Sequence, residues 1–184
     1  MNKFLLLFIL LNIYNFSNAS VKDNIILQLK KTENLSFYFK QTINENNEVG
    51  SCVIKYPKKI YCEYKNLNNK IIVSNGKSLV IKNKKDGKFW LYPLKKTPLE
   101  FLLDKDYLIK KINALEYRDV GNKYLNFKIT EKDNEINIFF DKKTFVLTGW
   151  QIEDVYQNLS ITFISSVAIN TRINENIFIL PKLD

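Results

Sequence analysis

Residues 50–64, GSCVIKYPKKIYCEY, alternate apolar and polar side chains on both sides of a Tyr-Pro-Lys turn. Alternation with a period of two around a proline is typical of a β-hairpin that buries one face. Pro57 suits the turn because its φ is fixed and it has no N–H that needs a partner. The face predicted to point inward carries Cys52, Ile54, Ile60, Cys62 and Tyr64.

The two cysteines stand at equal distances from Pro57 in the sequence. A turn of odd length centred on Pro57 would place Cys52 opposite Cys62, with Cβ atoms about 4.5–5.5 Å apart. A small adjustment from that spacing allows a disulfide, and export to an oxidising compartment would favour it. We therefore predict a cross-strand disulfide; the alternative is a pair of buried thiols, and a turn of even length would put the two side chains on opposite faces.

The remaining chain predicts two helices and a series of short strands. The helices are expected at residues 21–33, which are amphipathic, and at residues 97–103, where Thr97, Pro98 and Glu100 form a capping box. Asn75-Gly76 is a strong hairpin signal between residues 70–74 and 78–83, and residues 44–47 are expected to form another turn. The other strands are expected at residues 35–42, 89–92, 125–129, 136–140, 145–153, 159–163 and 177–180. Short turns at this spacing predict a mainly β fold with a few helices (α+β), built on a curved antiparallel sheet.

Residues 1–19 have the pattern of a secretory signal peptide. Lys3 is followed by an apolar segment and then by Ser17-Asn18-Ala19, whose small residues suit a cleavage site. The apolar segment is too short for a membrane span, although an uncleaved anchor is the alternative. Residues 20–184 are then expected to form one exported, monomeric domain with a single core.

Composition narrows the possible chemistry. The chain has no histidine, which excludes histidine-based triads and the common histidine metal sites. No glycine-rich phosphate loop is present, and the acidic pairs Asp104/Asp106 and Glu116/Asp119 are interpreted as solvated surface. The net charge is +9, but all except two of the basic residues are lysines and none interleaves with aromatics as in nucleic-acid binders. The sequence therefore predicts a binding protein rather than an enzyme, with no metal, no cofactor and no nucleic-acid partner.

Three segments resemble the periplasmic outer-membrane lipoprotein carrier family (LolA-type). The hairpin at residues 50–64 is similar to the first hairpin of that family. The sequence VSNGKSL at residues 73–79 is similar to its V-S-D/N-G-K-x-L turn, and Thr97-Pro98-Leu99 followed by FLL at 101–103 is similar to its T-P…L-L helix. With the predicted signal peptide and the strand-rich tail, the resemblance covers nearly the whole chain.

The resemblance implies a half-open barrel covered by a helical lid, whereas periodicity alone also allows an ordinary closed core. The implied lipid-binding cavity would be lined by Ile54, Ile60, Tyr64, Leu79, Ile81, Leu125 and Phe127. The implied lid would present Leu99, Phe101, Leu102 and Leu103. The family commonly has an arginine before the hairpin proline that helps to latch the lid. This chain has Tyr56 there, which predicts either a weaker latch or a hydrogen bond from Tyr56 instead.

The implied function is that of a periplasmic chaperone that carries acylated lipoproteins from the inner to the outer membrane. Its implied partners are an inner-membrane ATP-binding-cassette release complex and an outer-membrane receptor. The alternative is a related half-barrel that binds or senses a lipid without handing it to a receptor.

Overall fold

The computed structural model describes residues 19–65, 69–131, 134–153 and 157–182. Its core element is an 11-stranded sheet in the order β6-β5-β4-β3-β2-β1-β11-β10-β9-β8-β7. The strands are β1 (Asn34–Ile43), β2 (Asn46–Lys55), β3 (Lys59–Tyr64), β4 (Lys70–Asn75), β5 (Ser78–Asn83), β6 (Phe89–Pro93), β7 (Arg118–Val120), β8 (Tyr124–Glu131), β9 (Asn134–Asp141), β10 (Leu147–Glu153) and β11 (Leu159–Ile169). Every neighbouring pair is antiparallel.

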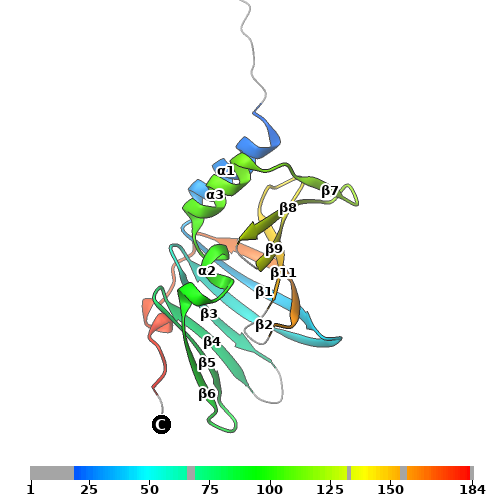
Figure 1. The fold of residues 1–184 in the computed structure, drawn as a ribbon. Coiled ribbons are helices and arrows are strands. Elements are labelled where there is room, and N and C mark those ends of the chain that lie inside the picture. The colour runs from blue at the N-terminus through cyan, green and yellow to red at the C-terminus, as the bar shows by residue number, and fades with distance from the viewer. Residues whose placement is uncertain (1–18, 66–68, 132–133, 154–156, 183–184) are drawn as a thin grey trace, which may run out of the picture.

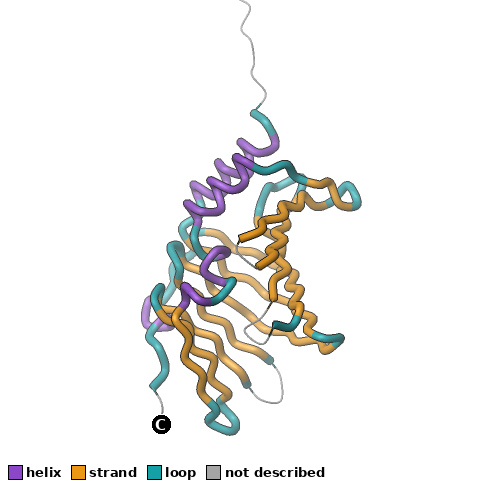
Figure 2. Tube along the Cα trace, viewed as in Figure 1, coloured by secondary structure: helices purple, strands orange, loops and turns teal. Residues whose placement is uncertain are grey.

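The sheet consists of two meanders, β1–β6 and β7–β11, which meet where β1 pairs with β11. It curls around an interior but does not close, because β6 and β7 remain its edges (Figures 1 and 2). The curved antiparallel sheet predicted from the sequence is therefore confirmed, as a half-open barrel.

The central hairpin has the predicted odd-length turn. Ile54 pairs with Ile60 and Cys52 with Cys62, and residues 56–58 lie between the strands. Cys52 and Cys62 form the predicted disulfide, with Cα atoms 4.1 Å apart. Gly50, at the start of the quoted stretch, lies beneath the ring of Phe39: a Cβ at this position would come within 2.7 Å of that ring and 2.2 Å of the Glu63 carbonyl oxygen. The glycine therefore allows Phe39 to pack against the sheet.

Two helices cover one end of the barrel (Figure 1). Helix α1 (Val21–Lys31) is the predicted amphipathic helix; it is capped by Ser20 and buries Ile25 and Leu29. Helix α3 (Lys105–Ala114) packs beside α1 and buries Leu108 and Ile112. The sequence interpretation missed α3, since it expected no helix after residue 103. The helix begins there because the Asp104 side chain accepts a hydrogen bond from the Tyr107 N–H, as an N-cap residue does.

Two local predictions were wrong, and one predicted turn is shorter than expected. Thr97 does not cap α2 (Leu99–Leu102); its hydroxyl donates to the Leu94 carbonyl at 2.8 Å and closes the short helix η1 (Leu94–Lys96). The last predicted strand is instead the short helix η2 (Glu175–Phe178), which is capped by Asn174. The turn expected over residues 44–47 is tighter, since only Asn44 and Glu45 leave the ladder, both with positive φ.

The predicted signal peptide lies almost entirely outside the described residues, and among those described no helix is long and apolar enough to cross a membrane.

Candidate functional site

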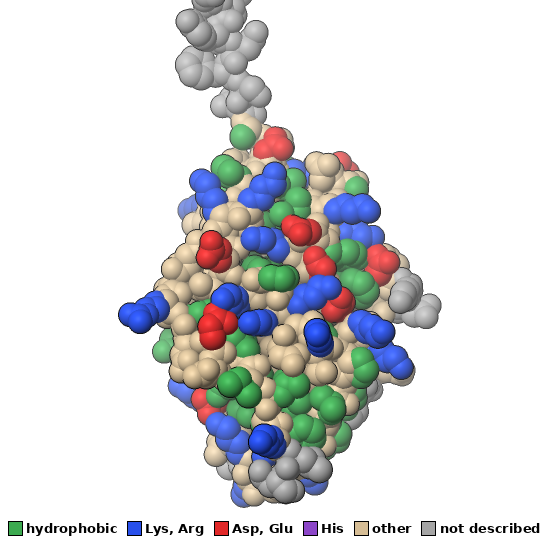
Figure 3. All heavy atoms as spheres, turned by 90° about the vertical axis from the view of Figure 1, so that its left-hand side faces the viewer, with side chains coloured by type: hydrophobic (Ala, Val, Ile, Leu, Met, Phe, Trp, Pro, Cys, Tyr) green, Lys and Arg blue, Asp and Glu red, His purple; other side chains and the backbone are tan. Residues whose placement is uncertain are grey.

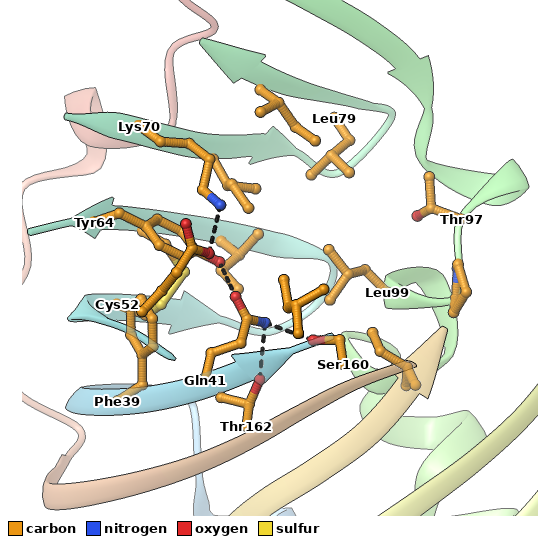
Figure 4. A pocket seen from close by; sticks show the side chains of 18 of the residues that line it. Phe39, Gln41, Cys52, Tyr64, Lys70, Leu79, Thr97, Leu99, Ser160 and Thr162 are labelled. Carbon is orange, nitrogen blue, oxygen red and sulfur yellow. Dashed lines mark hydrogen bonds and ion pairs between the residues drawn. A yellow bond between two sulfur atoms is a disulfide. The ribbon is translucent and has the colours of Figure 1, made fainter. Parts of the chain in front are cut away.

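An apolar cavity of about 310 Å³ lies inside the curve of the sheet, next to the segment that leads into α2 (Figure 4). This volume is at the small end of the range for ligand pockets, about 300–1,000 Å³. We define the lid as residues 97–104. The wall of the cavity is formed by β1–β6, β10 and β11, and the lid contributes Thr97, Pro98 and Leu99. The lining residues are Phe39, Gln41, Ile43, Glu48, Cys52, Ile60, Cys62, Tyr64, Lys70, Ile72, Leu79, Ile81, Asn83, Trp90, Thr97, Pro98, Leu99, Trp150, Ile152, Glu153, Ser160 and Thr162.

Four of the seven residues predicted to line a cavity do so: Ile60, Tyr64, Leu79 and Ile81. They lie on β3 and β5, and the disulfide-bonded residues Cys52 and Cys62 belong to the same wall. Their contact with lipid stays a prediction.

The other three predicted cavity residues lie in a closed core. Ile54, Leu125 and Phe127 are at most 1% exposed and do not belong to the cavity wall. The reason is that α1 and α3 fill this end of the barrel, so the side chains of β8 and β9 pack against them and against one another. Phe127, for example, meets Phe140 edge to face at 5.9 Å. The interior is therefore divided into a packed end under the helices and a hollow end away from them.

The predicted lid residues are also divided between the cavity wall and the closed core. Leu99 faces the cavity, whereas Leu102 and Leu103 are fully buried in the closed core. Phe101 is partly buried and its ring lies 5.1 Å from that of Tyr107 on α3. The lid is therefore anchored at its α3 end and presents its first turn to the cavity.

The lid is held to the hairpin turn by Lys58 rather than by Tyr56. The Lys58 N–H donates to the Leu103 carbonyl at 2.8 Å, and its Nζ contacts Glu100 Oε1 at 2.7 Å and Asp104 Oδ2 at 3.1 Å. Hydrogen bonds to these two carboxylates raise the pKa of Lys58. Ser74 Oγ donates to the Lys58 carbonyl, so the turn is also fixed to β4. We call this set of contacts the lid clamp.

Tyr56, at the position of the family's latching arginine, makes no hydrogen bond through its hydroxyl within the described part of the chain. The side chain is buried, and burial raises the pKa of the phenol. The hydrogen bond that the sequence interpretation considered for Tyr56 is therefore absent from this structure. A lysine two residues further along takes the polar contact to the lid.

The hollow end also contains polar side chains, and of these the sequence interpretation assigned only Tyr64 to the cavity. Gln41 Nε2 donates to Ser160 Oγ at 2.8 Å and to Thr162 Oγ1 at 3.0 Å, and Gln41 Oε1 accepts from the Tyr64 hydroxyl at 2.9 Å. Beside Tyr64, the Lys70 ammonium contacts Glu48 at 2.7 Å and lies 3.9 Å from the centre of the Tyr64 ring. Burial and the nearby Glu48 carboxylate raise the pKa of Tyr64. We call Gln41, Glu48, Tyr64, Lys70, Ser160 and Thr162 the polar row. All six line the cavity, and Figure 4 labels each of them except Glu48.

Strand β11 contributes to this row against its own hydrophobic pattern. The apolar alternation Leu159, Ile161, Phe163 predicts that these side chains face inward. Instead Ser160 and Thr162 are 1% and 2% exposed, while Leu159 and Phe163 are 49% and 42% exposed. Pairing with β1 fixes this orientation, since Gln41 lies opposite Thr162.

Charged side chains of both signs lie on the surface. On the face shown in Figure 3, basic side chains are interspersed with acidic ones. Within the described ranges, no group of three or more cysteine or acidic side chains is placed to hold a metal ion.

The curved sheet, the apolar cavity and the clamped lid together place the protein in the class of half-open barrels with an internal ligand pocket. The chain belongs to the outer membrane lipoprotein carrier protein LolA family, whose model matches residues 30–180. No curated protein sequence matches it significantly.

One solved structure shares the fold at low sequence identity, and others are similar at lower TM-scores. An uncharacterized conserved protein from Thermus thermophilus matches with a TM-score of 0.53 and 8% identity, over 88% of this chain and 92% of that one. A putative outer membrane lipoprotein-sorting protein domain from Vibrio parahaemolyticus matches with a TM-score of 0.47 and 7% identity, over 84% and 94%. The MucA/MucB complex structure from Pseudomonas aeruginosa matches with a TM-score of 0.48 and 11% identity, over 88% of this chain and 61% of that one.

Proposed function

We propose that this protein is a periplasmic carrier that shields the acyl chains of lipoproteins in its cavity while they move from the inner to the outer membrane. The observation that carries the proposal is the apolar cavity beside a lid held by an ion-pair clamp, in a chain of the LolA family. Residues 1–19 would direct export and be removed.

The physical requirement on such a carrier comes from its cargo. Each acyl CH₂ removed from water contributes roughly 0.8 kcal/mol, so an unshielded lipoprotein would aggregate or return to its membrane. The carrier must bind these chains and also release them. Because Leu99 forms part of the cavity wall, movement of the lid changes the space available to a ligand. Lid closure and acyl binding would then compete, and the lid clamp would set the balance.

The proposal includes partners that supply direction. An inner-membrane ATP-binding-cassette complex would release the cargo to the carrier, and an outer-membrane receptor would accept it. The carrier itself would need no cofactor and would not act as an enzyme, so ester substrates should not be turned over.

The deciding experiment uses residues 20–184 with inner-membrane vesicles that contain labelled lipoproteins. We expect ATP-dependent appearance of lipoprotein in the soluble fraction, bound to the carrier. Ile81→Glu, which places a charge in the cavity wall, should abolish this release. Leu91→Glu is the matched control, because Leu91 is 58% exposed on the neighbouring strand β6. Lipid binding without any release would favour the alternative, a half-barrel that binds or senses lipid without handover.

A further inference from the structure

The polar row lies on the wall of an otherwise apolar cavity, and its hydrogen-bonding capacity is not used up within the protein. Both amide hydrogens of Gln41 are taken, one by Ser160 Oγ and one by Thr162 Oγ1. A hydroxyl can accept two hydrogen bonds and donate one. Ser160 and Thr162 each accept from Gln41, and neither donates to any acceptor in the described ranges. Two buried hydroxyl hydrogens are therefore available to the contents of the cavity.

The position of these hydroxyls is not what packing alone would produce. Strand β11 turns Ser160 and Thr162 inward and leaves Leu159 and Phe163 exposed on the outside. Turning a hydroxyl into an apolar interior costs free energy unless it is hydrogen-bonded. Positions where the buried side chains contradict the hydrophobic pattern of their strand tend to be functional sites.

The charges of the cavity wall restrict the kind of acceptor. Lys70 is paired with Glu48 at 2.7 Å, and the remaining charged side chain on the wall is the acidic Glu153. The described wall therefore has no positive charge in excess, so it does not favour an ionised carboxylate or phosphate. A neutral acceptor such as a carbonyl oxygen suits the two hydroxyls and avoids the cost of an unpaired buried charge.

We infer that Ser160 and Thr162 form a subsite for the carbonyl oxygen at the head of a neutral acyl ester or amide, with its hydrocarbon chain in the apolar part of the cavity. Gln41 is the positioning residue: it fixes both hydroxyl oxygens, and Tyr64 fixes Gln41 in turn. The inference rests on the proposed function, since it names the part of the cargo that the cavity recognises. It predicts discrimination against free fatty acids, which carry the same chain with a charged head.

The test measures displacement of the neutral fluorescent probe N-phenylnaphthylamine from residues 20–184. Three competitors have chains of matched length and are used below their critical micelle concentrations. They are monolauroylglycerol, the dodecyl ether of glycerol, which lacks the carbonyl, and laurate at a pH above its pKa. We expect the ester to displace the probe about tenfold better than the ether, because two hydroxyl hydrogen bonds each contribute a few-fold. Laurate should be the weakest of the three.

Two variants assign the preference to the subsite. Thr162→Val keeps the shape of the side chain and Ser160→Ala removes the other hydroxyl; each should reduce the ester-over-ether ratio. The matched control is Thr148→Val on β10, which loses a hydroxyl bonded to the Phe139 carbonyl and does not belong to the cavity wall. Urea unfolding of all three variants checks that each is folded.

Equal displacement by ester and ether, stronger displacement by laurate, or an ester preference that survives in both Ser160→Ala and Thr162→Val would overturn the inference. Equal binding of ester and ether would still leave the proposed acyl-binding function standing. Failure of all three competitors to displace the probe would instead remove the proposed function, and this inference with it.

Discussion

Replacement of Lys58 by methionine should loosen the lid while leaving the cavity wall intact. The variant removes the ammonium that contacts Glu100 and Asp104 and keeps the aliphatic stem. Lys58 itself does not line the cavity. Its backbone N–H bond to the Leu103 carbonyl also survives the change, so the turn should keep its conformation.

The expected magnitude follows from the exposure of the three side chains, which are 31% exposed for Lys58, 20% for Glu100 and 29% for Asp104. Fully exposed ion pairs contribute about 0.2–1 kcal/mol, and hydrogen bonds to charged groups in buried positions about 1.5–3 kcal/mol. A partly exposed clamp with two carboxylates should fall between these ranges, at about 1–2 kcal/mol. That is a factor of about 5–30 in the equilibrium between closed and open lid.

The assay is equilibrium binding of N-phenylnaphthylamine. When the open lid is a minor state, apparent affinity scales with the open fraction, so Lys58→Met should bind the probe about 5–30-fold more tightly than wild type. The matched control is Lys84→Met, which loses an ion pair to Glu63 on the surface at 2.6 Å and should bind like wild type. Raised ionic strength should tighten binding to wild type and have little effect on Lys58→Met, because salt screens the clamp.

Alkaline pH gives a second readout of the same clamp. The pKa of Lys58 is raised in the folded state, so its stabilisation is complete below the unfolded pKa of about 10.4 and is lost as the pH rises through the folded value. Binding to wild type should therefore tighten above about pH 10.4 relative to Lys58→Met. Identical affinities for Lys58→Met, Lys84→Met and wild type at all salt concentrations would refute the reasoning that the clamp controls the lid.

Three further outcomes are expected. Replacing Cys52 and Cys62 together by serine should lower the free energy of unfolding by about 2–3 kcal/mol, because the disulfide restricts the entropy of the unfolded chain. Urea titrations measure this loss, and a loss below about 0.5 kcal/mol would contradict the entropic explanation. Tyr56→Phe should be neutral or stabilising by up to about 1 kcal/mol, because it deletes a hydroxyl that has no partner among the described residues. Tyr64→Phe should cost about 1 kcal/mol through the lost bond to Gln41, and the reverse order would show that Tyr56 has a polar partner. Burial raises the pKa of Tyr56 and of Tyr64, so the free energy of unfolding should fall as the pH rises above about 10. Tyrosinate absorbance should show that both side chains ionise only when the protein unfolds, and their titration in the folded state would contradict this.

The central hairpin could be predicted because its determinants are local. Alternation fixes which side chains share a face, and the odd-length turn around Pro57 fixes the register, so the Cys52–Cys62 disulfide follows from the sequence. Helix α3 was missed because its core positions, Leu108 and Ile112, form a short pattern within lysine-rich sequence. Much of what stabilises this helix is its packing beside α1, which is remote in the chain.

The hollow end of the barrel was only half predictable. Ile60, Leu79 and Ile81 were found because inward alternation is a local signal. Of the polar row only Tyr64 was found, because the members come from five strands and meet only through sheet register. One signal was available: Gln41 interrupts the inward series Leu35, Phe37, Phe39 and Ile43 on β1. The start of strand β11 gave a misleading signal, since Leu159 and Phe163 point outward.

The pairing of β1 with β11 determines when the pocket forms during folding. Well over half of the chain lies between these two strands, so this closure is the most costly in loop entropy, whereas most other strand pairs are local hairpins. Residues on both sides of the β1–β11 junction line the cavity, among them Ile60 from the first meander and Ile152 from the second. A chain that emerges N-terminus first can therefore form β1–β6 early, but it has no complete pocket until β11 arrives. Until then β1 is an open sheet edge next to an uncovered apolar face, which is the stage at which the chain is most exposed to pairing with other chains.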